Sequence, residues 1–600
     1  MNYPDNDYEV LFKPKQDPER KIKKSLFLIG IFLTPITLGG ALWGYIRAYY
    51  RKLQDEDLPP SLEPLHPFAR KAMFVFAAVT WLIILGAALI FFIAVMSGGD
   101  YGGPSLLYQI LVFYLIPNSI ITFLVMRNFN IWRGKIYAMR SKANMFGSAK
   151  WADKKDFSEY VGGKGIYIGA GYVYSKMGHL ISVAGTRSGK ATNLIFPNLL
   201  GASDYDGSWL VIDPKGEGAS VTASYQKSIG NDVQVLDPWG VVNGQTTATF
   251  NPLDIFSAND TESLIDDATM MANMIVPENK SGKDPYWDDR ARSIIAAMIA
   301  FCIEAANNDL EIYAKYSDFH SLTNVWRFLR LSEDDFADLL FDMTQSNVEF
   351  ISLIANEIVS LKINAGNTFG AVMSTAQSHT DFLKSPALQK SIEKSSFEVK
   401  NLSKKKTTLY VVIPPDRLAS QGKWLRLVVS SALRAVIRNK GHRVTFVLDE
   451  FAAIGNLGPD ISSFMAVGAG YNITLWPIFQ TISQLQEIYD KSWQTFLGNA
   501  AVKHFFGIGD NATAKYVSDM IGGSTYVVYD KNIIGEDKSD PKQRMLATPD
   551  EVRRGSSDNI FTFVDQKPAG MVQKWNYWDM DKLKGRYDKN PMYVNSVDAK

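Results

Sequence analysis

The segment from Ile181 to Leu200 contains residues whose spacing suits phosphate chemistry. An apolar run ends in a short loop rich in small residues, and a helix-like segment follows the loop. In such a strand–loop–helix unit, backbone N–H groups and the positive end of the helix bind phosphate oxygens. Lys190 would reach the β- and γ-phosphates as a point charge. The predicted nucleotide-binding residues are Ala184, Gly185, Thr186, Arg187, Ser188, Gly189, Lys190, Ala191 and Thr192.

This loop departs from the pattern G-x-x-x-x-G-K-[ST] at two positions. Ala184 stands in place of the first glycine, and Ala191 replaces the hydroxyl residue that would hold magnesium. Thr192 comes one place later, so Ser188 or a water molecule would have to serve instead. On this pattern alone, a glycine-rich turn with an exposed lysine is the alternative interpretation.

A second chemical element lies far downstream, where an apolar run over Val444–Leu448 ends in Asp449 and Glu450. This is the Walker B form. We expect Asp449 to hold Mg²⁺, directly or through water, and Glu450 to polarise the water that attacks the γ-phosphate. Gln480 ends the next predicted strand, where a γ-phosphate sensor would stand, although a polar residue leaving a sheet is an equally good interpretation. The sequence therefore predicts ATP and Mg²⁺ as cofactors and Lys190, Glu450 and Gln480 as catalytic residues.

Further apolar runs, separated by helix-like segments, predict the sheet that positions these residues. Their alternation is typical of an α/β fold with a doubly wound, mostly parallel sheet. From residue 258 to about 395 the strand signals almost vanish and helical spacing dominates, which predicts an all-helical insertion. The segment beyond Tyr526 is polar and rich in turns, and it gives no clear prediction. The additional predicted strands are Leu210–Ile212, Val233–Leu236, Thr408–Ile413, Ile473–Phe479 and Val502–Phe506.

Length and composition limit the classes of protein to consider. A chain of 600 residues exceeds one compact core, so we expect two or more domains. The net charge of +1 excludes a globally basic nucleic-acid binder, but not a locally basic channel. A single cysteine excludes an internal disulfide, and the six histidines show no metal-binding spacing.

Three apolar runs near the N-terminus, residues 26–46, 72–96 and 106–126, are each long enough to cross a bilayer. Lysine and arginine are plentiful in every flank except the linker Ser97–Ser105, which contains neither. The positive-inside rule therefore places that linker outside and the other flanks inside. We expect a transmembrane hairpin of residues 72–96 and 106–126, with residues 26–46 re-entrant or interfacial. Three true spans with the N-terminus outside are the alternative.

Several longer motifs together resemble the type IV secretion coupling proteins, the TraG/TraD-type ATPases of conjugation and effector export. The resemblance spans nearly the whole chain, and the combination of motifs is highly specific where any one alone is not. The segments that carry it are GSAKWADKKD, GTRSGKATNLIFPNLL, VIDPKGE, VLDPWG, NPLD, FVLDEFAAIGNL, WPIFQTISQLQEIY and FFGIGDNATAKYVSDMIG.

The resemblance implies a RecA-like P-loop NTPase anchored in the bacterial inner membrane, with its ATPase domain in the cytoplasm. Such proteins are thought to form hexamers. They bring relaxase-bound DNA or protein effectors to the inner-membrane components of the secretion channel. The implied organisation is a membrane anchor over residues 1–140, a nucleotide-binding domain over 141–257 and 396–600, and an all-α domain over 258–395.

Three functional alternatives follow from these observations. The leading one is an ATPase that drives or gates substrate transfer; a weakly hydrolysing ATP-binding receptor and an FtsK-like DNA pump are the others. The sequence does not decide between DNA and protein as cargo. If an adjacent subunit completes the site with an arginine, Arg417 and Arg434 are the candidates.

Overall fold

The computed structural model describes residues 147–256, 261–277, 285–307, 320–454, 468–529 and 539–593, with Leu89, Phe92, Ile93, Met96, Ser97, Lys315, Tyr316, Asp318, Phe464 and Met465. The chain divides into a unit of residues 1–146 with 525–542 and a unit of residues 147–524 with 543–600. The second unit contains every predicted site residue.

The predicted membrane segments lie almost entirely outside the described residues. Residues 26–46 and 106–126 are outside them, and only four residues of 72–96 are described. Within the described part of the chain, no helix combines the length and the apolar character needed to cross a bilayer.

A nine-stranded sheet forms the centre of the second unit. Its strands are β3 (His179–Ala184), β4 (Gly207–Asp213), β5 (Asp232–Leu236), β6 (Thr407–Val412), β7 (Arg443–Leu448), β8 (Ile473–Phe479), β9 (Ala500–Phe506), β12 (Asn559–Val564) and β13 (Gly570–Gln573). The order across the sheet is β13-β12-β9-β3-β8-β7-β4-β6-β5. All neighbours from β9 to β5 are parallel, whereas β12 is antiparallel to both β9 and β13. The predicted mixed α/β fold with a mostly parallel sheet is confirmed.

The central strands are apolar because helices cover the sheet on both faces. β3, β4, β6 and β8 are buried along their whole length. Along β3, Ile181 and Val183 point into one hydrophobic cluster, while Leu180 and Ala184 belong to the cluster on the other face. Strands buried on both faces appear in a sequence as continuous apolar runs, which explains why the sequence predicted them to within three residues.

The helices that cover the sheet come from both halves of the unit. After β3 the chain forms a π turn over Ala191–Ile195 and then α6 (Phe196–Leu199). A small hairpin of β1 (Ile166–Gly169) and β2 (Tyr172–Tyr174) precedes β3. The other helices are α7 (Glu217–Ser228), α15 (Asn401–Lys404), α16 (Leu418–Arg438), α17 (Phe451–Ile454), α19 (Ile482–Tyr489), α20 (Trp493–Asn499), α21 (Asn511–Ile521) and α22 (Pro549–Gly555).

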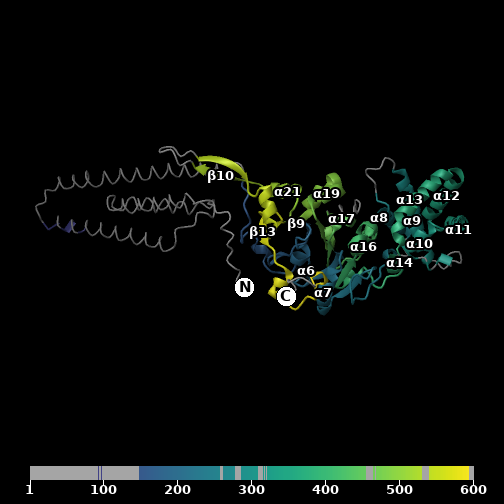
Figure 1. Cartoon of the computed structure of the whole chain (residues 1–600), viewed down its shortest axis with the longest axis horizontal. Coiled ribbons are helices and arrows are strands. Elements are labelled where there is room, and N and C mark those ends of the chain that lie inside the picture. The colour runs from purple at the N-terminus through teal and green to yellow at the C-terminus, as the bar shows by residue number, and fades with distance from the viewer. Residues whose placement is uncertain are drawn as a thin grey trace. The chain divides into compact units, whose positions relative to one another are not determined.

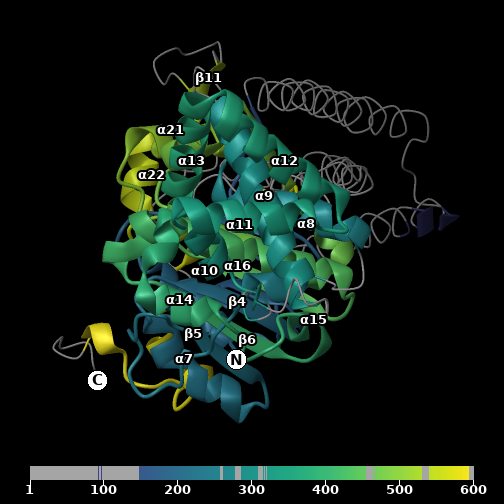
Figure 2. The same ribbon diagram turned by 90° about the vertical axis from the view of Figure 1, so that its right-hand side faces the viewer.

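Every element described between residues 261 and 392 is helical. Figure 1 shows α9 to α13 gathered on one side of this unit, away from β9 and β13, and Figure 2 shows the same group after a quarter turn. Whether residues 258–395 form a domain of their own stays a prediction. The helices are α8 (Thr261–Ile275), α9 (Tyr286–Ala306), α10 (Leu322–Phe328), α11 (Glu333–Thr344), α12 (Glu349–Asn364), α13 (Gly366–Thr380) and α14 (Pro386–Ile392).

The segment beyond Tyr526, for which we made no structural prediction, contains both strands and helices. β10 (Gly523–Tyr529) and β11 (Ser539–Met545) form a two-stranded sheet. After β12 and β13, the last described residues return across the start of the unit. There Tyr577 packs edge-on against Phe196, with ring centroids 5.6 Å apart. Arg586 donates to the Leu200 carbonyl at 3.2 Å. The segment that contains Tyr577 and Arg586 is thereby attached to the helix that follows β3.

Candidate nucleotide site

The phosphate loop follows β3 at the carboxyl edge of the sheet, where its glycines are required by close contacts. The Gly185 N–H donates to the Phe506 carbonyl at 3.2 Å. A Cβ atom on Gly185 would lie 2.1 Å from the Gly507 carbonyl oxygen, so no side chain fits there. Gly189 has φ +86°, in the left-handed region that favours glycine. Arg187 adopts φ 58° despite its side chain, a strained backbone of the kind found at functional sites.

The predicted binding residues at the two ends of the loop differ in burial and in hydrogen bonding. Ala184 is the last residue of β3 and is fully buried. The Thr192 hydroxyl, one place late for the magnesium-binding position of the pattern, lies in the π turn. It donates to the Gly189 carbonyl at 3.3 Å or to the Asn576 side-chain oxygen at 3.1 Å. Ala191 is half-buried and packs against the second hydrophobic cluster.

Lys190 lies between the two predicted Walker B carboxylates. Its Nζ is 2.8 Å from Asp449 Oδ1 and 3.2 Å from Glu450 Oε2. Burial alone would disfavour the charged ammonium, but the two carboxylates outweigh burial and raise the pKa of Lys190 above its ordinary value. The three side chains meet because β3 and β7 run parallel, with β8 between them, and so end at the same edge.

Gln480 joins this group from the end of β8. Its Nε2 donates to Glu450 Oε1 at 2.5 Å, and its Oε1 accepts from the Thr186 hydroxyl at 3.3 Å. Glu450 itself has φ 57°, a left-handed conformation that is costly for a residue with a side chain. A continuous polar network therefore runs from the phosphate loop, through the sensor position, to both carboxylates.

Comparison with known proteins identifies the family of this chain. A family model described as "Type IV secretory system Conjugative DNA transfer" matches residues 134–599. The chain belongs to this family. It is a type IV secretion coupling ATPase, as the motifs predicted.

Relatives of this coupling protein include conjugal transfer protein TraG of Escherichia coli, which is 27% identical over 521 residues, 76% of this chain and 78% of that protein. Protein VirD4 of Rhizobium radiobacter is 25% identical over 448 residues, 71% of this chain and 60% of that protein. Among solved structures, the bacterial conjugative coupling protein TrwBdeltaN70 has a TM-score of 0.53 at 15% identity, covering 72% of this chain and 94% of that one. This structural likeness shows a shared fold.

A buried aspartate stands next to the carboxylate pair of the coupling protein. β4 pairs with β7, so Asp213 at the end of β4 lies beside Asp449. Burial raises the pKa of Asp213 to about 7, against the effect of the Ala219 N–H, which donates to its carboxylate at 2.8 Å. The negative charges of Glu217 and Asp449 act in the same direction as burial. Asp213 therefore carries a proton for part of the time at neutral pH.

Sequence reasoning missed the residues that hold the phosphate loop from behind. A Cβ atom on Gly507, which has φ +59°, would lie 2.2 Å from the Ser188 Cβ. Ser556 in turn fixes Gly507, because its carbonyl accepts the Gly507 N–H at 2.8 Å. The one available signal was the glycine directly after the buried strand β9, in FFGIGD. Nothing in the sequence around Asn576 indicated its contact with Thr192.

The two candidate arginines differ in accessibility. Arg417 ends a 3-10 turn at the carboxyl edge of β6, with 47% of its side chain exposed and Asp416 3.7 Å away. Arg434 is half-buried within α16. Arg417 is therefore the more accessible of the two to a neighbouring subunit.

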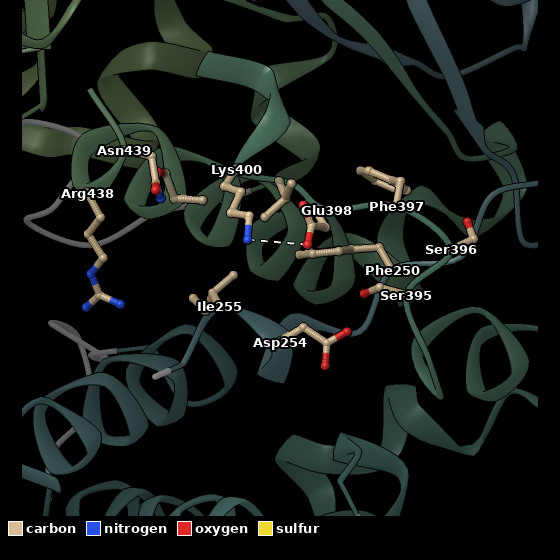
Figure 3. Close-up of a pocket in the computed structure, with 12 residues that line it drawn as sticks. Phe250, Asp254, Ile255, Ser395, Ser396, Phe397, Glu398, Lys400, Arg438 and Asn439 are labelled. Atoms are coloured by element: carbon tan, nitrogen blue, oxygen red, sulfur yellow. Dashed lines mark hydrogen bonds and ion pairs between the residues drawn. The ribbon is translucent and has the colours of Figure 1, made fainter. Parts of the chain in front are cut away.

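A separate cavity of about 400 Å³ lies where the chain enters and leaves the helical segment. Figure 3 shows Asp254, Lys400 and Arg438 around it, with Lys400 3.3 Å from Glu398. Lys400 precedes β6 and Arg438 precedes β7, so this cavity adjoins the amino edge of those strands. The phosphate loop lies at the opposite edge, and the cavity is therefore not part of the nucleotide site.

Proposed function

We propose that the site binds ATP with Mg²⁺ and hydrolyses it to drive or gate substrate transfer into a type IV secretion channel. The observation that carries the proposal is the position of the Lys190 ammonium at the end of the phosphate loop, 2.8 Å from Asp449 and 3.2 Å from Glu450. One cation and two carboxylates at that edge match the charges of a triphosphate, its counter-ion and an attacking water.

Each residue of the network has a distinct proposed role. The loop N–H groups other than those of Gly185 and Ser188, which donate to the Phe506 and Gly185 carbonyls, cradle the phosphates up to Lys190. The Lys190 ammonium neutralises charge on the β- and γ-phosphates. Glu450 orients and polarises the attacking water as general base. Gln480 contacts both Glu450 and Thr186, so it is positioned to report the γ-phosphate to the catalytic carboxylate.

The oxygens present at the site fit magnesium. Mg²⁺ prefers oxygen ligands and keeps several of its waters. Asp449 supplies a carboxylate, and the buried Ser188 hydroxyl oxygen has no hydrogen-bond partner among the described residues. When bound, magnesium would neutralise charge on the phosphate oxygens. We assign Asp449 as the residue that holds it, directly or through water, with Ser188 as the hydroxyl that replaces the one missing at Ala191.

The proposed transfer function also requires a membrane anchor, an oligomer, a cargo and a channel. In this proposal, residues 26–46, 72–96 and 106–126 form the anchor in the inner membrane, with the ATPase unit in the cytoplasm. The chain assembles as a homo-oligomer, with six copies as the resemblance implies, and Arg417 of one copy completes the site of the next. The cargo is relaxase-bound DNA, protein effectors or both, delivered to the inner-membrane components of the channel.

The test combines ATP hydrolysis by the purified full-length protein with transfer in cells. Lys190→Ala should abolish nucleotide binding and transfer, whereas Glu450→Gln should retain binding and lose hydrolysis and transfer. Lys515→Ala and Glu487→Gln, at exposed positions on α21 and α19, are the matched controls. Wild-type hydrolysis and transfer rates in both site variants would refute the proposal that this site drives or gates transfer.

One observation favours a second candidate, a receptor that binds ATP for assembly and recruits substrate with little hydrolysis. Ala191 removes a magnesium-binding hydroxyl, and the Thr192 hydroxyl is engaged by Gly189 and Asn576. In this case Lys190→Ala would abolish transfer while Glu450→Gln would leave it unchanged. That pattern separates the receptor from the motor.

A further inference from the structure

The order of strands fixes the direction in which a triphosphate must lie, given the proposed ATP site on which this inference rests. β3, which carries the phosphate loop, has β8 on one side and β9 on the other. Gln480 and the carboxylates of Asp449 and Glu450 all lie on the β8 side. The γ-phosphate must point toward them, so the nucleoside leaves the loop toward β9 and β12.

The segment Lys574–Asn576, directly after β13, occupies that side of the loop. Asn576 accepts from Thr192 at 3.1 Å. Lys574 donates to the carbonyls of Ser556 and Ser557, and its Nζ lies 5.3 Å from the centre of the Phe506 ring. Phe506 accepts the backbone N–H of Gly185, the first glycine of the loop. The segment therefore connects to both ends of the phosphate loop.

Trp575, between these two residues, is a large aromatic side chain with little role in the core. It is half-buried and belongs to neither hydrophobic cluster of the described residues, whereas the following Tyr577 and Trp578 both pack in the second cluster. Its indole N–H donates to Gln573 at 3.4 Å. A Cβ atom on Gly171, in the β1–β2 turn, would lie 3.8 Å from the Trp575 ring. One edge of the ring thus rests against this turn.

We infer that Lys574–Asn576 forms the nucleoside side of the ATP site, with the Trp575 ring as a stacking surface for the base. An aromatic ring that the core leaves partly uncovered is suited to stack on a flat heteroaromatic base. Asn576 is a positioning residue, because it acts through Thr192 at the start of the helix rather than on the ligand. Its amide nitrogen donates to Asp579 at 3.1 Å, which holds the amide in this orientation.

The test compares two ligands that share the phosphates and differ in the nucleoside. A non-hydrolysable ATP analogue and inorganic tripolyphosphate, each with Mg²⁺, are titrated into the full-length protein in mild detergent, and binding is measured by calorimetry. Trp575→Ser should weaken the ATP analogue by about 5- to 100-fold, the range that base–aromatic stacking gives, and leave tripolyphosphate unchanged. Trp575→Phe should restore most of the affinity.

Two further variants make the outcomes distinguishable. Tyr471→Ser removes an exposed aromatic side chain that precedes β8, at the opposite edge of the sheet, and should leave both ligands unaffected. Lys190→Ala should weaken both ligands together. If the wild-type protein binds neither ligand, the proposed ATP site itself is wrong. If it binds both but Trp575→Ser changes neither affinity, or lowers both equally, the nucleoside assignment is overturned.

Discussion

Substitution of Gly507 by alanine tests the claim that the end of β9 holds the phosphate loop in place. The new Cβ would lie 2.2 Å from the Ser188 Cβ, far inside the separation of about 3.5–4.0 Å at which carbon atoms attract. In addition, φ is +59°, and the left-handed conformation costs a residue with a side chain about 1–2 kcal/mol. Overpacking costs about 1–3 kcal/mol more, so the total is about 2–5 kcal/mol.

The steric conflict can either lower the stability of the folded protein or displace the phosphate loop, and both effects are measurable. If the loop keeps its position, the midpoint of thermal unfolding falls. If Ser188 moves away by an ångström or more, the loop amides no longer point at the phosphates and kcat/KM for ATP falls by about a hundredfold. We therefore expect a loss in at least one of these measurements, and the relative size of the two losses shows how rigidly Ser188 is held.

Gly509 supplies the matched control, two residues further along the same loop. A Cβ at Gly509 would meet nothing within 4 Å, and no left-handed backbone angle is needed there. Gly509→Ala should therefore keep the wild-type unfolding midpoint and ATPase rate. Equal behaviour of the Gly507 and Gly509 variants in both assays would refute the proposed contact between β9 and the phosphate loop.

Three other perturbations test separate parts of the structure. Ala191→Ser restores the missing hydroxyl and should raise Mg²⁺-dependent ATP turnover by about tenfold, as measured in steady state; an unchanged rate would mean that the site needs no hydroxyl at this position. Arg438→Met leaves the buried Asp267 carboxylate without the partner now 2.5 Å away, and should lower unfolding stability by about 3–5 kcal/mol; stability equal to wild type would show that Asp267 finds another partner. Burial lowers the pKa of His179 and of His504 to about 4, so the unfolded chain binds more protons than the folded one below about pH 6.5. Stability from these two residues is present above that pH and is lost as the pH falls toward 4. His504→Gln should flatten that part of the pH–stability curve, and an unaltered slope would contradict the assignment.

The carboxyl edge of the sheet, where the proposed nucleotide site lies, was predictable because the relevant information is local. β3, β7 and β8 are short apolar runs; a glycine-containing loop follows β3, and a polar residue follows each of β7 and β8 directly. Parallel strands bring their carboxyl ends to one edge. Lys190, Glu450 and Gln480 therefore meet as their positions in the sequence imply. The left-handed backbone of Glu450 has no comparable signal, because the strain is imposed by the surrounding structure.

The C-terminal contacts were not predictable because they join residues that are far apart in the sequence. Thr192 and Asn576 are 384 residues apart, and neither residue type indicates a partner. β12 and β13 join the sheet by antiparallel pairing at its β9 end, which the β-α alternation of the preceding chain does not foreshadow. Such contacts depend on how the folded elements meet, so only the tertiary structure reveals them.

The departure of the phosphate loop from its usual pattern and the C-terminal contact form one local arrangement. The helix after Lys190 begins with a π turn, and Asn193 donates to the Gly189 carbonyl at 2.8 Å within it. The Thr192 hydroxyl, which reaches the same carbonyl, is also within hydrogen-bonding distance of Asn576. A hydroxyl one place late in the pattern is therefore engaged in holding the helix to the C-terminal segment. The same contact brings Asn576 beside the loop, so Thr192, whose hydroxyl is displaced by one place in the pattern, connects the phosphate loop to the C-terminal part of this unit.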